Sequence, residues 1–174
     1  MNHTRNQLSC KFLPCWPHRP IEKMFDEGPQ NLFSRQGQCL LQIGVALFLV
    51  TSFESFVIPY FASPMLGRST HSLCALLGVM LIALGLTWPR LNLGRTTLQI
   101  AFWFLIYSGF AIVAAFLLAA IWGAGNSTMP LAAGPAHGSA FQEQVIKVVA
   151  YSSAPTGIVS FAMILWGLRI VNDQ

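Results

Sequence analysis

The sequence predicts an all-α integral membrane protein, a four-helix bundle with both termini on the cytoplasmic side (N-in/C-in). Only 9% of the residues are charged and 54% are hydrophobic, whereas about a quarter of the residues of an ordinary soluble domain are charged. The mean hydropathy is +0.56. Between Arg35 and Glu143 the single acidic residue is Glu54, and the basic residues are Arg68, Arg90 and Arg95. A soluble domain built from this stretch would lack a charged outer face, so we expect the lipid bilayer to surround it.

A spanning helix needs roughly 20 mainly apolar residues. Four segments meet this length, at about 37–58, 70–88, 97–122 and 145–171. Residues 1–36 are polar and rich in proline, so they predict a partly disordered cytoplasmic tail. This tail has no apolar core of the kind found in secretory signal peptides. We therefore expect a tail (1–36) and one transmembrane domain (37–174), in the cell inner membrane as a multi-pass protein.

The ends of the expected spans carry recognisable signals. The first span ends at Pro59, and the second ends at Trp88 followed by another proline. The third ends at Trp122, just before a glycine. The fourth contains a polar stretch with Pro155 inside it. Tryptophan is common at membrane interfaces, and proline and glycine commonly mark helix ends.

Basic residues predict the orientation, because Lys and Arg accumulate on the cytoplasmic side. With the N-terminus inside, the outer side holds only Arg68 and Lys147. The inner side then holds Arg5, Lys11, Arg19, Lys23, Arg35, Arg90, Arg95 and Arg169. This bias accounts for the net charge of +4 without a nucleic-acid partner, which we do not expect.

Small residues recur at helical spacing. Ala111, Ala115 and Ala119 follow one stripe of the third span, and Gly78 and Gly85 share a face of the second. Small residues allow transmembrane helices to approach closely. We expect close helix contacts at these positions, either within the chain or between subunits.

Ionisable residues inside a membrane are functional candidates, because burying them is costly. Glu54 lies near the outer end of the first span, where we expect a solvated carboxylate or one paired with Arg68. His71 lies at the outer mouth of the second span. It is a candidate metal or haem ligand, although a histidine there also fits a helix cap or an interfacial polar group. No second histidine lies inside a span, which argues against a haem with two histidine ligands and hence against an electron carrier.

Three more residues are candidates for chemistry. His137 lies in the long outer loop, where it either lines a mouth over the bundle or is solvated. Tyr107 and Ser108 lie well inside the third span. A buried tyrosine hydroxyl usually finds a hydrogen-bond partner, so these two residues suit either substrate binding or helix packing.

Several short motifs resemble hydroxylaminobenzene mutases. They are the stretch from Phe56 to Pro64 followed by Gly67 and His71, then Gly78, Gly85 and Trp88, then Ala101-Phe102-Trp103 with Tyr107, then His137-Gly138 with Gln142-Glu143, and finally Trp166-Gly167-Leu168-Arg169. The resemblance covers roughly residues 40–170. It implies a membrane isomerase that rearranges an aryl hydroxylamine such as hydroxylaminobenzene to 2-aminophenol, a reaction of nitroaromatic degradation.

That family is similar to the bacterial styrene oxide isomerases, which share an Ala-Pro pair in the fourth span, here Ala154-Pro155. In those proteins a histidine at the start of the second span ligates haem b, and the subunits form trimers. The resemblance therefore implies that His71 is an axial haem ligand and that the chain forms a homo-oligomer, a trimer. For a small aromatic substrate, our candidate catalytic residues are Tyr107, Ser108 and His137.

The sequence departs from the family pattern at three positions. An acidic residue and an asparagine usually follow the histidine two and six places on, where this chain has Leu73 and Leu77, and Ile112 replaces a further asparagine. Either Tyr107, Ser108, Ser152 or Ser153 takes over the polar roles, or activity is weak or lost. The alternatives are a non-catalytic or haem-holding subunit that assembles with an active paralogue, an epoxide isomerase, and a small four-span transporter.

Overall fold

The computed structural model describes residues 29–133 and 138–169, and in these residues it contains helices and no strands. Four of the helices are long and apolar enough to cross a membrane. They are α1 (Pro29–Val57), α2 (Pro64–Thr87), α3 (Arg95–Trp122) and α5 (Ala140–Gly167). The short elements are the 3-10 helices η2 (Ile58–Tyr60) and η3 (Trp88–Arg90) and the helix α4 (Pro130–Ala133). The predicted all-α four-helix membrane bundle is confirmed.

The helices extend beyond the spans that we expected. α1 begins at Pro29 and α2 at Pro64, so residues 29–36, which we assigned to the polar tail, are helical. Both helices start at a proline, which is favoured in the first turn because its missing N–H has no partner there anyway. Helix α5 begins earlier as well, because Ser139 and Gln142 form a capping box. At its other end α5 stops at Gly167, short of the expected end at 171.

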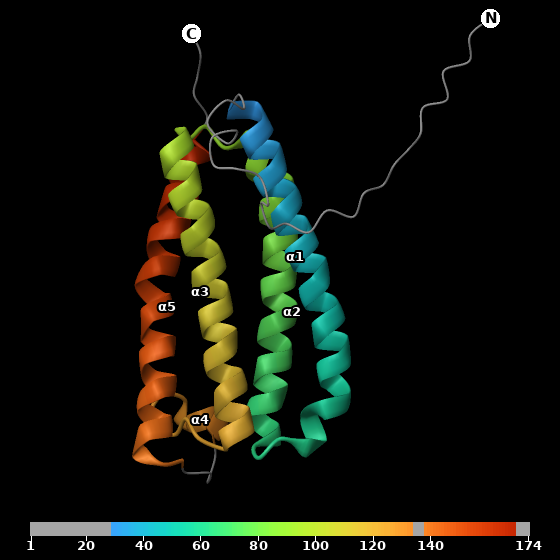
Figure 1. The fold of residues 1–174 in the computed structure, drawn as a ribbon, viewed down its shortest axis with the longest axis vertical. Coiled ribbons are helices and arrows are strands. Elements are labelled where there is room, and N and C mark those ends of the chain that lie inside the picture. The colour runs from blue at the N-terminus through green and yellow to red at the C-terminus, as the bar shows by residue number, and fades with distance from the viewer. Residues whose placement is uncertain (1–28, 134–137, 170–174) are drawn as a thin grey trace, which may run out of the picture.

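The bundle consists of two helix pairs (Figure 1). α1 packs along α2, and α3 packs along α5, while α2 and α3 share a smaller contact. α1 begins and α5 ends at one end of the bundle, as an even number of spans requires. The other end holds η2, α4 and the start of α2, and we call it the distal end.

Glycines bring α1 and α2 into backbone contact. A Cβ atom on Gly37 would lie 2.9 Å from the carbonyl oxygen of Gly85, and one on Gly44 would lie 2.8 Å from that of Gly78. The two glycines of each helix are separated by one heptad, so both pairs lie on one continuous line of contact. We call this line the glycine seam. The close contact expected at Gly78 and Gly85 is confirmed.

The buried residues form two clusters. The larger one joins all four long helices and includes Leu40, Leu81, Trp88, Leu105 and Ile164. The smaller one lies near the distal end and includes Leu66, Ala119, Ala133 and Ile146. Ala111 and Ala115 are buried too, so the alanine stripe of α3 lies in the interior as expected. Many large apolar side chains point outward instead, among them Leu49, Phe53, Phe56 and Leu165, as they should in a protein surrounded by lipid.

Replacing Gly44 by leucine tests the glycine seam. The added side chain would collide with the Gly78 carbonyl and with Ile82, so we expect G44L to lower the free energy of unfolding by about 2 kcal/mol or more. Thermal unfolding of the detergent-solubilised protein, followed by tryptophan fluorescence, measures the loss. The matched control is A46L, because Ala46 is exposed on the same helix. Equal melting temperatures for G44L and A46L would contradict the packing described.

Candidate functional site

His71 is half-buried on α2, in the part of the helix nearer the distal end. Its Nδ1 atom lies 3.4 Å from the hydroxyl oxygen of Ser55 on α1. The Ser55 hydroxyl donates to the Thr51 carbonyl oxygen at 3.3 Å. A serine hydroxyl has one proton to donate. If that proton goes to Thr51, Ser55 accepts a hydrogen bond from Nδ1–H of His71, and Nε2 keeps an unshared electron pair that can bind a metal ion.

The glycine seam determines which residues face His71. Thr51 follows Gly44 by one heptad, and His71 precedes Gly78 by one heptad. Thr51 is 5% exposed, and its hydroxyl donates to the Leu47 carbonyl at 2.7 Å. The register that joins the glycines therefore continues to Thr51 and His71. His71 lies one heptad beyond the glycine contacts of α1 and α2.

Glu54 belongs to the same polar group. Its two carboxylate oxygens are buried, and no described residue forms a hydrogen bond with either. Glu54 directly precedes Ser55, the partner of His71. We expected a solvated carboxylate or a pair with Arg68, and that expectation was wrong. Glu54 follows the buried Leu47 by two helical turns, so it is on the face of α1 that packs against α2, and its position near the end of the span does not bring it to water.

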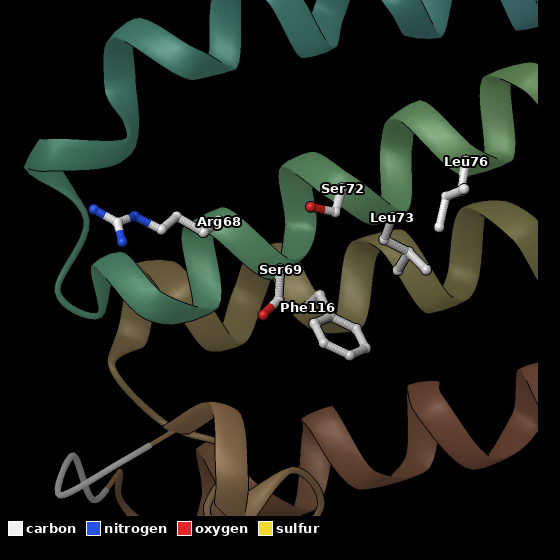
Figure 2. Close-up of a pocket in the computed structure, with 6 residues that line it drawn as sticks. All are labelled: Arg68, Ser69, Ser72, Leu73, Leu76 and Phe116. Carbon is white, nitrogen blue, oxygen red and sulfur yellow. The ribbon is translucent and has the colours of Figure 1, made fainter.

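Between α2 and α3, along the same stretch of α2 that carries His71, the surface is hollowed (Figure 2). The hollow has a volume of about 420 Å³ and is lined by Arg68, Ser69, Ser72, Leu73, Leu76 and Phe116. The Arg68 side chain extends away from the other five residues. The remaining lining is a hydrophobic wall with two serine hydroxyls, which suits a small ligand with an apolar body and one polar group.

Tyr107 and Ser108 lie in the contact between α3 and α5. The Tyr107 hydroxyl oxygen is 2.9 Å from Ser152 Oγ, and Ser152 Oγ donates to the Val149 carbonyl at 2.8 Å. Because the single Ser152 proton is already used, Tyr107 donates to Ser152. Ser108 donates to the Ser153 carbonyl oxygen at 2.9 Å. In this arrangement the Tyr107 oxygen can accept another hydrogen bond, while its proton is engaged.

The candidate residues do not form one group within the chain. Tyr107 faces α5, whereas His71 faces α1. Gly109, two residues after Tyr107, contacts Leu77 of α2, and Leu77 lies about 9 Å along the helix axis from His71 at 1.5 Å per residue. The structure thus separates Tyr107 and Ser108 from the imidazole. His137 lies outside the described residues.

Glu143 has a role that the sequence did not reveal. Its carboxylate accepts hydrogen bonds from the backbone N–H groups of Gly125 (2.7 Å), Asn126 (3.1 Å) and Ser127 (3.1 Å), and from the Ser127 hydroxyl (2.6 Å). The carboxylate fixes the loop after α3 to the first turn of α5. The glycines at 123 and 125, both with positive φ, are a sequence signal for a tight loop.

The three positions that depart from the family pattern have distinct surroundings. Leu73 lines the hollow. Leu77 is 6% exposed, and its Cδ1 atom would lie 2.8 Å from a Cβ on Gly109. Ile112 is half-buried on α3. Leu77 thus fills a close contact between α2 and α3, and of the three only Leu73 lines the hollow.

Comparison with known proteins shows one matching family and two similar relatives. The family model for styrene oxide isomerase matches residues 36–169. The hydroxylaminobenzene mutase HabB of Ectopseudomonas oleovorans is 45% identical over 130 residues, which cover 75% of this chain and 79% of HabB. The hydroxylaminobenzene mutase HabA of the same organism is 32% identical over 129 residues, covering 74% of this chain and 96% of HabA. No solved structure matches.

The matched region contains α2, α3, α5 and most of α1, together with the residues of the polar group and the hollow. The resemblance expected from the short motifs is therefore confirmed. The chain belongs to the styrene oxide isomerase family, together with these hydroxylaminobenzene mutases, and it is an isomerase.

Proposed function

We propose that this protein rearranges an aryl hydroxylamine, such as hydroxylaminobenzene, to the 2-aminophenol within the membrane. The observation that carries the proposal is the 45% identity over 130 residues to HabB, a hydroxylaminobenzene mutase by name. The hollow along the same stretch of α2 as His71 supports it, because its size and lining suit a small aromatic molecule.

The reaction is an isomerisation and needs no second reactant. The N–O bond of the hydroxylamine breaks, positive charge spreads into the ring, and the oxygen becomes bonded to the ortho carbon. The proton lost from that carbon is balanced by one gained at nitrogen, so substrate and product have the same atoms. An apolar site excludes bulk water and so limits its attack on the cationic ring. Aromatic faces such as those of Phe110 and Phe116 stabilise positive charge nearby.

In this proposal His71 would hold a haem b as its one histidine ligand. The described residues hold no group of three or more His, Cys, Asp or Glu side chains positioned for a metal ion, but a haem iron needs only one protein side chain. With Nδ1 held by Ser55, the electron pair on Nε2 is available. A bound haem would supply a Lewis acid for the oxygen of the substrate.

Three further residues are assigned roles in this proposal. The Tyr107 oxygen, whose proton is held by Ser152, accepts a hydrogen bond from the substrate N–H or O–H. Ser108 keeps α3 and α5 in register through the Ser153 carbonyl, and so positions Tyr107. His137 is proposed as a proton acceptor from its place in the sequence. Because Tyr107 and His71 lie apart within one chain, a homo-oligomer such as a trimer is part of the proposal.

The location of the protein completes the proposal. We place the chain in the inner membrane, with α1 beginning and α5 ending on the cytoplasmic side, because that orientation leaves only Arg68 and Lys147 at the distal end. A reaction that starts from an aryl hydroxylamine fits the breakdown of nitroaromatic compounds.

Membranes that contain this chain should convert hydroxylaminobenzene to 2-aminophenol. We expect product by liquid chromatography from membranes of expressing cells, and only background conversion from membranes of cells with an empty vector. Unchanged substrate from a well-expressed, folded protein would contradict the proposal. Activity that appears only when a second four-span protein co-purifies would instead support the alternative of a non-catalytic subunit.

The variant H71A tests the haem assignment. We expect the purified wild type to show a Soret absorption band that H71A lacks, and turnover to fall at least about a hundredfold. M65A is the control, since Met65 is exposed on the same helix and should leave both readouts unchanged. A colourless wild type from haem-replete cells, or a Soret band that persists in H71A, would refute ligation by His71.

The variant Y107F separates a role in the reaction from a role in packing. Losing the hydrogen bond to Ser152 should lower the free energy of unfolding by only about 1 kcal/mol. If the oxygen also binds the substrate, turnover should fall about a hundredfold. Y151F is the control, because Tyr151 is exposed on α5. Wild-type turnover in Y107F, with the small loss of stability alone, would assign Tyr107 to packing.

A further inference from the structure

The hollow between α2 and α3 has no role assigned by the motifs or by the relatives. It is a shallow, open depression of about 420 Å³ and not a closed cavity. A single aromatic ring with a polar substituent is small enough to lie in it, against its wall. The hollow and His71 share the same stretch of α2, since Ser72 follows His71 directly and Ser69 precedes it by two residues.

The wall of the hollow is suited to a ring. Leu73 and Leu76 come from α2, and Phe116 comes from α3. Figure 2 shows the Phe116 ring below the Ser69 and Leu73 side chains, so that the three line one space. A bound ring would contact two leucine side chains and the Phe116 ring. Two aromatic rings pack best in edge-to-face or offset arrangements.

The serine hydroxyls can recognise the polar group of such a ligand. Ser69 donates its proton to the Met65 carbonyl oxygen at 3.2 Å, so its oxygen is left as an acceptor. The hydroxyl of Ser72, also on the lining, is a second polar group at helical spacing from Ser69. An aryl hydroxylamine offers N–H and O–H donors to these oxygens.

From these contacts we propose that the hollow binds the aryl ring of the substrate, and that Leu73 makes it select rings with small apolar substituents. The proposal rests on the proposed function and adds to it where the ring binds and what the site prefers. An acidic side chain at position 73 would place a charge in this wall, whereas leucine makes the wall hydrophobic. Substituents such as methyl or chloro should therefore be accepted more readily than ionised ones.

Changing the size of residue 73 tests the proposal in the full-length protein in lipid nanodiscs. L73F fills the hollow, so we expect KM for hydroxylaminobenzene to rise at least about tenfold while kcat changes less than about twofold. L73A enlarges the hollow, so KM for a bulkier substrate, 4-tert-butyl-phenylhydroxylamine, should fall relative to the wild type. V79F is the control, because Val79 is exposed on the same helix and does not line the hollow. Unchanged KM values in both Leu73 variants would overturn the proposal.

A binding measurement keeps the test independent of catalysis. Saturation-transfer NMR with aniline as the probe should show binding to the wild type and V79F, and at least about tenfold weaker binding to L73F. If the wild type is inactive but this pattern holds, the proposed reaction fails while the ring site stands. If L73F binds aniline as the wild type does, and instead loses co-purifying lipid by native mass spectrometry, the hollow holds an acyl chain and the proposal is wrong.

Discussion

The close approach of α1 and α2 along the glycine seam is the contact on which the candidate site depends. In lipid the hydrophobic effect does not drive helices together, so close van der Waals packing must hold them in contact. Gly37 against Gly85 and Gly44 against Gly78 bring the backbones into contact. One heptad further on, the same register places His71 beside α1, where Ser55 holds its Nδ1 atom. A shift of this register would remove the imidazole from its partner.

The polar side chains of this bundle form two sets, one within each helix pair. One set lies between α1 and α2, around His71 and the buried carboxylate of Glu54. The other lies between α3 and α5, where Tyr107 and Ser108 bind groups of the polar stretch that precedes Pro155. α2 and α3 share the smaller contact, and the hollow opens between them near the distal end. The looser packing between the pairs thus leaves room for a ligand, while the tight packing within each pair fixes the side chains beside it.

Much of the fold could be predicted from the sequence, because length and hydropathy alone identify spanning helices. The heptad from Gly78 to Gly85 also indicated a close contact correctly. It was harder to separate the depth of a residue in the membrane from the helix face on which it lies. Glu54 was judged by its distance from the end of a span, but its carboxylate is buried because it shares a face with Leu47. The links from Ser55 to His71 and from Glu143 to the loop after α3 depend on contacts between distant residues, which no local pattern in one sequence reveals.

We infer that α1 holds His71 in the tautomer with a proton on Nδ1 and a free electron pair on Nε2. Nitrogen-15 NMR of the histidine side chains, on haem-free protein in lipid nanodiscs and with a His71→Gln variant for assignment, measures this directly. We expect a neutral imidazole with protonated Nδ1, and a shift in the tautomer balance when Ser55 is replaced by alanine. A His71 protonated mainly on Nε2, or one that does not respond to the Ser55 change, would contradict the account.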